Sequence, residues 1–326
     1  MGLVFELLGS LPPAAGRPAD ADAEYEPEET ILLLEDALRE LGHEPLRLGG
    51  PRELLARGAG GASLGADAVL CIAEGEGSRN REAWAPVLLE MLGVPTLGSD
   101  ALTLSLSLDK LWAKQIVAAA GVATAPAASV LSAAEAEAAA RALGFPLFVK
   151  PRWEGTAKGI LRSSRTETPA ALAAEVERIV ASYRQPALVE EFLPGAEYTV
   201  CVVGTPPRAL PVLQRALERE TGIGVHALAG EGGARLPHHA PGELTPALEA
   251  ELGAAALAAF RALRCLDFAR VDFKLDAAGR PAFLEINPLP TFAGDGSFAI
   301  LAELLGVSYA RFLAGVIREG LRRLGL

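Results

Sequence analysis

Basic side chains are scarce in this sequence of 326 residues, in which 30 lysines and arginines face 41 aspartates and glutamates. The formal charge is −11, and lysine occurs only five times. A protein that binds nucleic acid needs a basic face to neutralise phosphates, and an anionic membrane surface attracts the same kind of face. We therefore expect small-molecule ligands, with neither nucleic acid nor membrane as a partner.

Long hydrophobic runs are also missing, although half of the residues are hydrophobic. The longest apolar runs, such as residues 252–260, are far shorter than the ~20 residues of a membrane-spanning helix. The N-terminus lacks the basic stretch of a signal peptide, and Glu6 interrupts its apolar run. The cysteines stand singly in apolar segments, which is typical of buried free thiols in a reducing compartment; they are Cys71, Cys201 and Cys265. These features favour a cytoplasmic protein, and leave open whether it forms a homodimer.

Strand and helix signals alternate over the first hundred residues. Short apolar runs at residues 3–8 and 68–73 predict buried strands, and leucines at helical spacing predict a helix over residues 31–41. Another helix is predicted around residues 87–91. This alternation is typical of a parallel, doubly wound α/β sheet.

The pattern changes after residue 100. Apolar spacing predicts helices over residues 108–121 and 133–143, and a long helix that begins near Pro246. Strand-like segments joined by turns are found at residues 145–149, 187–192, 198–203, 268–275 and 282–286. Such segments are typical of antiparallel sheets, so two α+β lobes are expected after the α/β domain.

The most informative segment is a predicted β-hairpin over residues 268–288. Strand alternation places Arg270 and Asp272 on one face, and the short turn brings Glu285 nearly opposite Asp272, with Asn287 on the same face as Glu285. An arginine beside two carboxylates and an amide oxygen resembles a magnesium–phosphate site. A solvated polar face is the alternative. Lys274 shares the polar face, whereas Leu284 and Ile286 are expected on the opposite one.

A second segment places a lysine at the end of an apolar strand. Lys150 is followed by a loop that is bounded by Gly155 and Gly159 and contains Thr156. A lysine charge and backbone N–H groups bind phosphate well. The P-loop pattern G-x-x-x-x-G-K-[ST] does not occur in the chain. An ordinary turn remains the alternative to a phosphate loop.

A third segment, residues 188–200, consists of an apolar strand, a Pro-Gly turn and another strand. The backbone of such a hinge is able to meet the edge of an adenine ring. Glu190 and Glu197 would then hydrogen-bond the adenine amine and the ribose hydroxyls. The alternative is a hairpin with exposed acids.

In this order and spacing, the three motifs resemble the ATP-grasp superfamily, and within it the D-alanine–D-alanine ligase family. The similarity extends over nearly the whole chain and includes Glu24, residues 92–99, Lys110 and Lys114. It implies an N-terminal Rossmann-like preATP-grasp domain of α/β class followed by a two-lobed ATP-grasp fold of α+β class, with ATP between the lobes. The implied divisions are residues 1–99, a central lobe at 100–187 and a C-terminal lobe with the metal site at 188–326.

The resemblance also implies roles for individual residues. Arg270 would stabilise the acyl phosphate and the tetrahedral intermediate, and Glu24 and Thr156 would position the amine of the first substrate. Two magnesium ions would be held by Asp272, Glu285 and Asn287. The residues implied to bind ATP are Lys110, Phe148, Lys150, Gly155, Gly159, Glu190, Glu191, Phe192, Leu193, Glu197 and Leu284.

The implied activity is ADP-forming ligation of an amino acid or similar carboxylate to an amine through an acyl phosphate. Several departures from the family pattern fall at substrate positions. Residues 73–82 replace the family's HG-x-x-GEDG loop, the family's Ser-Leu pair for the second amino acid is not evident in residues 294–298, and residues 214–240 lack the Lys–Tyr pair that lies over the phosphates. In their place stand Arg215, Arg219, His226, Arg235, His238 and His239. We therefore expect an acceptor other than D-alanine. The missing lysine favours the alternative, a non-catalytic or partner-dependent ATP-binding relative with a regulatory role.

Overall fold

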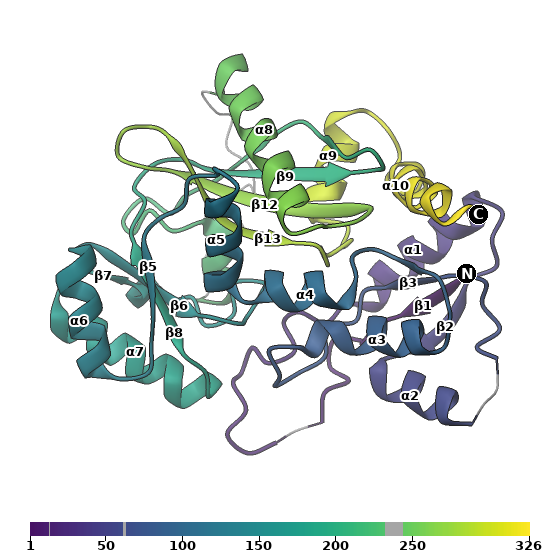
Figure 1. The fold of residues 1–326 in the computed structure, drawn as a ribbon, viewed down its shortest axis with the longest axis horizontal. Coiled ribbons are helices and arrows are strands. Elements are labelled where there is room, and N and C mark those ends of the chain that lie inside the picture. Colours follow the sequence, from purple (N-terminus) through teal and green to yellow (C-terminus); the bar gives the residue numbers. More distant parts are fainter. Residues whose placement is uncertain (13, 61–62, 232–243) are drawn as a thin grey trace.

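Three β-sheets follow one another along the chain in the computed structural model, which describes residues 1–12, 14–60, 63–231 and 244–326 (Figure 1). The first sheet is parallel, and the other two are antiparallel. The expected order of an α/β domain and two α+β lobes is therefore confirmed.

The N-terminal sheet has the strand order β2-β1-β3-β4. Its strands are β1 (Gly2–Val4), β2 (Leu46–Gly49), β3 (Val69–Cys71) and β4 (Thr96–Leu97), and its helices are α1 (Glu28–Glu40), α2 (Pro51–Ala59) and α3 (Trp84–Met91), with a 3₁₀ turn η1 (Arg81–Ala83). Alternate residues of β1 belong to different cores, because Leu3 packs with α1 whereas Val4 packs with α2 and α3. Burial on both faces explains why β1 and β3 are apolar throughout.

Two helices lead from this sheet to the next, α4 (Ala101–Leu108) and α5 (Lys110–Ala119). The helix expected over residues 108–121 begins at Lys110, because Asp109 caps it by accepting a hydrogen bond from the backbone N–H of Trp112. The central sheet follows with the order β5-β8-β6-β7, and α6 and α7 pack together against one of its faces. The bounds are β5 (Ala127–Val130), α6 (Ala133–Leu143), β6 (Leu147–Pro151), η2 (Arg162–Ser164), β7 (Arg165–Thr166), α7 (Pro169–Tyr183) and β8 (Ala187–Glu191).

Strand β8 affects where the central lobe ends. It pairs with β5 and β6 along its whole length, so the division implied at residues 187/188 cuts through a strand. We propose that the central lobe ends after Glu191, because hydrogen bonds of one sheet hold the strand up to that residue.

The C-terminal sheet has the order β10-β9-β12-β13, with β11 also paired to β9. Its elements are β9 (Glu197–Val203), β10 (Arg208–Ala209), β11 (Leu213–Arg215), η3 (Val225–Glu231), α8 (Pro246–Ala262), β12 (Phe268–Leu275) and β13 (Pro281–Asn287). One face of the sheet is apolar and packs against α5 and α8, with Val200, Val271 and Phe273 fully buried. The opposite face carries polar residues, as strand alternation predicts.

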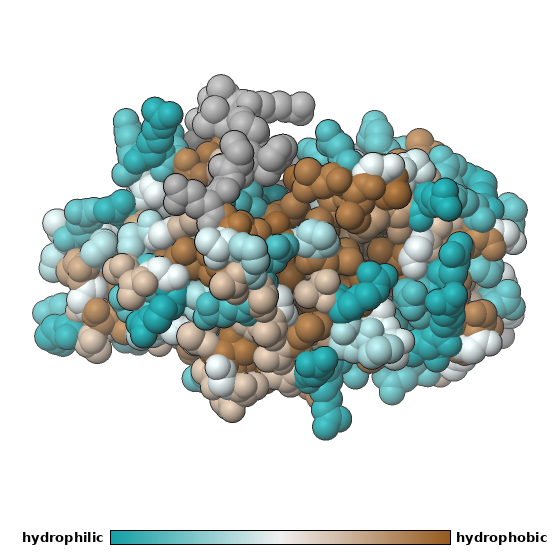
Figure 2. Space-filling view, turned by 90° about the horizontal axis from the view of Figure 1, so that it is seen from above, coloured by the Kyte–Doolittle hydropathy of each residue, from teal (hydrophilic) through white to brown (hydrophobic). Residues whose placement is uncertain are grey.

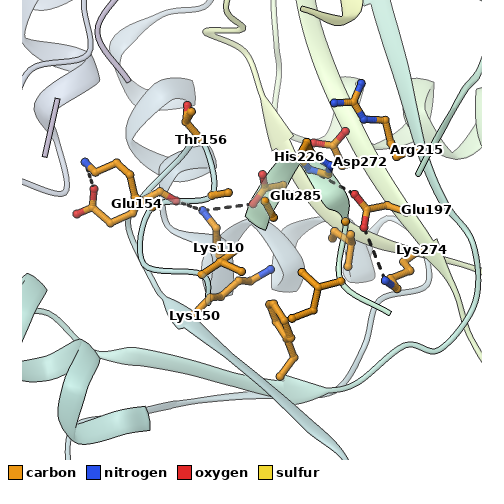
Figure 3. Close-up of a pocket in the computed structure, with 18 of the residues that line it drawn as sticks. Lys110, Lys150, Glu154, Thr156, Glu197, Arg215, His226, Asp272, Lys274 and Glu285 are labelled. Carbon is orange, nitrogen blue, oxygen red and sulfur yellow. Dashed lines mark hydrogen bonds and ion pairs between the residues drawn. The ribbon is translucent and has the colours of Figure 1, made fainter. Parts of the chain in front are cut away.

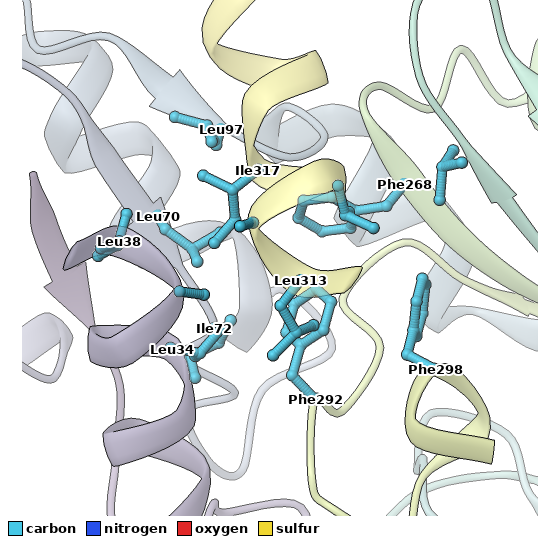
Figure 4. Packing of buried hydrophobic residues seen from close by; sticks show 14 of the residues in the cluster. Leu34, Leu38, Leu70, Ile72, Leu97, Phe268, Phe292, Phe298, Leu313 and Ile317 are labelled. Atoms are coloured by element: carbon cyan, nitrogen blue, oxygen red, sulfur yellow. The ribbon is translucent and has the colours of Figure 1, made fainter. Parts of the chain in front are cut away.

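A large hydrophobic cluster joins the C-terminal lobe to the N-terminal sheet (Figure 4). It is built around α10 (Tyr309–Leu324), which follows α9 (Ser297–Leu304). Leu313 and Ile317 of α10 lie between Leu38 of α1 and Phe268 of β12. The last helix of the chain therefore fastens the first domain to the last sheet.

The surface is hydrophilic at both ends of the molecule when it is seen from above, and hydrophobic residues gather nearer the middle (Figure 2). The three cysteines are buried and free, as predicted. Within the described ranges, no single helix is long and apolar enough to cross a bilayer; α9 and α10 qualify only as a pair bent by 113°.

Candidate functional site

One pocket collects side chains from the central and C-terminal sheets (Figure 3). Most of the predicted site residues line it: Lys110, Phe148, Lys150, Thr156, Glu190, Glu191, Phe192, Leu193, Glu197, Arg270, Asp272, Leu284 and Glu285. The predicted residues Glu24, Gly155, Gly159 and Asn287 are not among its lining residues.

The β12–β13 hairpin forms the acidic end of the pocket. Asp272 pairs directly with Glu285 in the sheet register, as predicted from the sequence. Thr199 donates a hydrogen bond of 2.7 Å to Asp272, and Arg270 reaches both carboxylates, with N–O distances of 2.9 Å to Asp272 and 3.8 Å to Glu285. One guanidinium thus holds two carboxylates that would otherwise repel each other.

Leu284 does not follow the regular alternation of a β-strand, which would place it on the face opposite to Glu285. The register shifts between Asp272 and Phe273, so that Phe273 pairs with Phe283 and Leu284 is the extra residue. This β-bulge explains how Leu284 and Glu285 both line the pocket although they are neighbours in sequence.

Buried lysines lie beneath and beside these acids. Lys110 is 3.3 Å from Glu285, while Lys114 and Lys150 each lie 2.8 Å from Glu190. Burial alone would raise the pKa of Glu190, but the two ammonium groups outweigh it and lower this pKa to about 2. Glu190 is therefore a fixed anion that holds two cations in place.

The other end of the pocket is apolar. The rings of Phe148 and Phe192 lie 6.4 Å apart, and Leu193 and Leu284 belong to one small hydrophobic cluster. Apolar walls next to backbone donors and acceptors suit a flat heteroaromatic ring. This end lies on the hinge between β8 and β9 that the sequence predicted.

Glu24 is held in a buried network of charges outside the pocket lining. Arg81 donates to both of its oxygens at 2.8 and 3.0 Å, Lys158 donates at 2.9 Å, and the backbone N–H of Gly155 donates at 2.6 Å. A Cβ atom at Gly155 would lie 2.7 Å from the carboxylate, so a glycine is needed for this approach. Glu24 thereby fastens the glycine loop to the N-terminal domain.

A second buried acid of this network, Glu82, gives stability an unusual pH dependence. Burial raises the pKa of Glu82, the Arg81 guanidinium lowers it and Glu24 raises it, with a result of about 7. Between pH ~4.5 and ~7 the native state therefore holds a proton that the unfolded state has lost, so the free energy of unfolding falls as the pH rises. We expect Glu82→Gln to reduce this slope without abolishing it, because burial also raises the pKa of Glu74, which acts in the same direction. Relative to the wild type, the variant should gain on the order of 1 kcal/mol in free energy of unfolding between pH 5 and pH 8.

Urea unfolding of both proteins at pH 5 and pH 8 measures this difference. Glu90→Gln, on the neighbouring helix α3, serves as the control and should leave the slope unchanged. Parallel pH profiles of the wild type and Glu82→Gln would contradict the prediction.

Several pocket residues have no role in the sequence analysis. Lys274 and Arg215 lie on the polar face of the C-terminal sheet. Lys274 could have been found from the sequence, because strand alternation places it on the same face as Asp272. Glu154 directly precedes the glycine loop and Lys158 lies within it, and His226 lies 3.5 Å from Glu197. No local pattern marks Glu154, whose place depends on how the loop folds. Arg235, His238 and His239 lie outside the described residues.

The hairpin offers oxygen donors of the kind that a magnesium ion prefers. In the described part of the chain no three His, Cys, Asp or Glu residues converge as a metal cluster. Two carboxylates do converge on one cation, and carboxylate oxygens with substrate phosphates are the usual ligands of Mg²⁺. The side-chain oxygen of Asn287 accepts from the Leu289 N–H at 2.9 Å. Asp272 and Glu285 therefore fit the ion, with Asn287 at the end of the same strand.

The comparisons with known proteins agree on one family. The model for the D-ala D-ala ligase C-terminus matches residues 116–318. An uncharacterised protein, y4sG of Sinorhizobium fredii, is 33% identical over 301 residues, which cover 88% of this chain and 86% of that protein. The D-alanine–D-alanine ligase of Bordetella petrii is 33% identical over 234 residues, 71% of this chain and 69% of the ligase.

The same fold is found in the solved structure of the Bacillus anthracis D-alanine–D-alanine ligase complexed with ATP. The two chains share 21% sequence identity with a TM-score of 0.69, over 98% of this chain and 96% of the other. The family model and the similarity to curated relatives lead to one conclusion: this chain belongs to the D-alanine–D-alanine ligase-like family of the ATP-grasp superfamily.

Proposed function

We propose that the protein is an ADP-forming ligase that uses ATP to join a carboxylate to an amine through an acyl phosphate. The observation that carries the proposal is the pocket itself, with an apolar end at Phe148 and Leu193 and a charged end at Arg270, Asp272 and Glu285. Two relatives that match 71% and 72% of the chain, from Bordetella petrii and Halorhodospira halophila, are D-alanine–D-alanine ligases, which supports the same chemistry.

ATP would lie along the pocket with its adenine at the apolar end. The side chains of Phe148, Phe192 and Leu284 would enclose the ring, and the backbone of Glu191 and Leu193 would meet its edge. Glu197 would hydrogen-bond the ribose, whereas Lys110 and Lys150 would contact the phosphates. Glu190 would then act mainly through Lys150, because its carboxylate already pairs with Lys114 and Lys150.

Asp272, Glu285 and Asn287 would hold magnesium, which neutralises phosphate charge when it is bound. In the reaction, the substrate carboxylate attacks the γ-phosphorus and ADP leaves, and the amine then displaces phosphate from the acyl phosphate. Both steps build up negative charge on oxygen. Arg270 is placed to stabilise that charge without reorganising, because Asp272 already fixes its guanidinium.

The glycine loop would protect the acyl phosphate from water. Thr156 lines the pocket, and the loop is tied to the N-terminal domain through the N–H groups of Gly155, bonded to Glu24, and Gly159, bonded to Asp20. Water must be kept from an acyl phosphate because hydrolysis would waste it. These two hydrogen bonds would hold the loop in place over the reacting groups.

We also propose that the substrates differ from D-alanine. The resemblance gives Glu24 the task of binding the first substrate's ammonium group, yet here Arg81, Lys158 and Gly155 take both of its oxygens. A second ammonium group would have to compete with two buried cations for one carboxylate. The absence of the Lys–Tyr pair from residues 214–240 supports the same conclusion.

ADP release in the presence of magnesium tests this function. Purified protein and ATP are incubated with pairs of carboxylates and amines, including D- and L-amino acids, short peptides and carboxylates that lack an amino group. We expect one pair to raise ADP release at least tenfold and to yield the amide, detected by mass spectrometry.

Two results would contradict the proposal. Efficient formation of D-alanyl-D-alanine would overturn the substrate assignment but not the ligase chemistry. ATP binding without stimulation by any pair would favour a regulatory ATP-binding relative. Wherever a substrate pair stimulates ADP release, Lys150→Met should abolish the stimulation, whereas Arg141→Gln, an exposed change on α6, should not.

A further inference from the structure

Arg215 is a pocket residue with no assigned role. It ends β11, whose pairing with β9 sets Arg215 directly opposite Glu197. Its side chain forms part of the pocket wall, on the side of Asp272 and Glu197 (Figure 3). The inference drawn below rests on the proposed function, because it concerns how the same pocket binds its nucleotide.

Arg215 differs from the other basic side chains of the pocket in having no acidic partner. Each of the others lies within 4.0 Å of a carboxylate: Lys110 of Glu285, Lys150 of Glu190, Lys158 of Glu24, Lys274 of Glu197 and Arg270 of Asp272. Among the described residues, none forms an ion pair with Arg215. Judged on the residues that the structure describes, Arg215 is therefore a pocket cation without a carboxylate partner.

The guanidinium of Arg215 is partly buried in an environment that disfavours its charge unless an anion binds to it. Its Nη1 atom is buried and has no hydrogen-bond partner among the described residues. Burial and the nearby Arg270 guanidinium lower the pKa of Arg215, although Asp272 and Glu197 act in the opposite direction. An unsatisfied buried donor on a charged group is costly, and a bound anion would remove that cost.

The position of Arg215 indicates which anion this is. The guanidinium lies near Arg270 and Asp272, both of which influence its pKa, and Figure 3 shows Arg215 on the side of the pocket where Asp272 lies. Phosphate oxygens match the planar donor fork of an arginine. We propose that Arg215 binds the polyphosphate of the nucleotide and so supplies a phosphate contact beyond Lys110 and Lys150.

Binding measurements that need no turnover test this proposal. The affinities of the full chain for ATP, for a non-hydrolysable ATP analogue and for adenosine are measured by calorimetry with magnesium present. We expect Arg215→Gln to weaken binding of ATP and its analogue about tenfold to a hundredfold, as the loss of a charge-assisted hydrogen bond does, and to leave adenosine binding within twofold. The ATP affinity of Arg215→Lys should lie between that of the wild type and that of Arg215→Gln.

A matched control and a stability measurement separate binding from folding. Arg219→Gln changes an exposed arginine four residues further along the same segment and should not affect ATP affinity. Thermal unfolding without nucleotide should show no loss of stability in Arg215→Gln, because an unpaired buried charge is removed. A structural role would instead lower the melting temperature.

The results of these measurements distinguish a failure of the Arg215 assignment from a failure of the proposed ligase function. Unchanged ATP affinity in Arg215→Gln would overturn the assignment, and a raised KM for a carboxylate substrate alone would show that Arg215 binds the substrate instead. Selective loss of ATP affinity in a protein that ligates nothing would support Arg215 while overturning the ligase. Failure of the wild type to bind ATP would overturn both.

Discussion

An Arg270→Met variant is expected to release ADP with a kcat about 10²–10³-fold below that of the wild type, the usual loss when one group that stabilises a developing oxyanion is removed. Arg270 lies 2.9 Å from Asp272 and 3.8 Å from Glu285, so its charge is fixed before the reaction begins. Methionine keeps most of the side-chain volume but offers no donor. The measurement is steady-state ADP release with the substrate pair found by the screen.

The control for this variant lies on the same hairpin. Arg280→Gln changes an exposed arginine that forms an ion pair with Asp276 in the turn, and should leave kcat within twofold. Arg270→Lys keeps the charge without the forked donors and should recover part of the loss. If Arg270→Met retained more than a fifth of the wild-type kcat, charge stabilisation by this residue would be ruled out.

Phe268→Ala should lower the free energy of unfolding by about 3–5 kcal/mol, as is typical when a buried phenylalanine is truncated. Phe268 is 1% exposed, and its ring meets that of Phe292 edge-to-face at a centroid distance of 5.3 Å. The ring also lies close to Gly98, at the end of the N-terminal sheet. The cavity would therefore open where the first domain joins the last sheet.

Urea unfolding measures this loss, and Leu304→Ala provides the control. Leu304 is a large apolar residue at the end of α9, but it is 62% exposed, so its truncation should change stability by no more than about 0.5 kcal/mol. A loss below 1 kcal/mol in Phe268→Ala would show that the cluster around α10 does not hold the two parts of the chain together.

The best predicted feature of the protein is the β12–β13 hairpin. Its two strands are separated by a turn of only a few residues, so the turn fixes the register and places Asp272 opposite Glu285. Strand alternation then determines which side chains share the face with Arg270. The bulge at Leu284 was not predicted, because the alternation of apolar residues is the same with or without one extra residue in the strand.

Helix α10 was missed although its sequence has a helical period. Its residues Leu313, Val316, Ile317 and Leu321 fall at helical spacing and are all buried. Strand β11 has three residues and pairs at the edge of β9. Three residues are too few to show the alternation of a strand. The position of Arg215 in the pocket therefore became known only from the pairing of β11 with β9.

Alone, the sequence determined the succession of sheets, the polar face of the hairpin and the lysine at the end of β6, because each depends on residues close together in the chain. Only the tertiary structure decided which distant groups meet. Arg81 and Glu24 are 57 residues apart, and Glu24 and Lys158 are 134 apart. Such pairs depend on how whole domains pack, which local periodicity does not encode. The scarcity of basic residues could be read directly from the sequence, whereas only the fold distinguished the paired cations of the pocket from Arg215, which has no ion pair among the described residues.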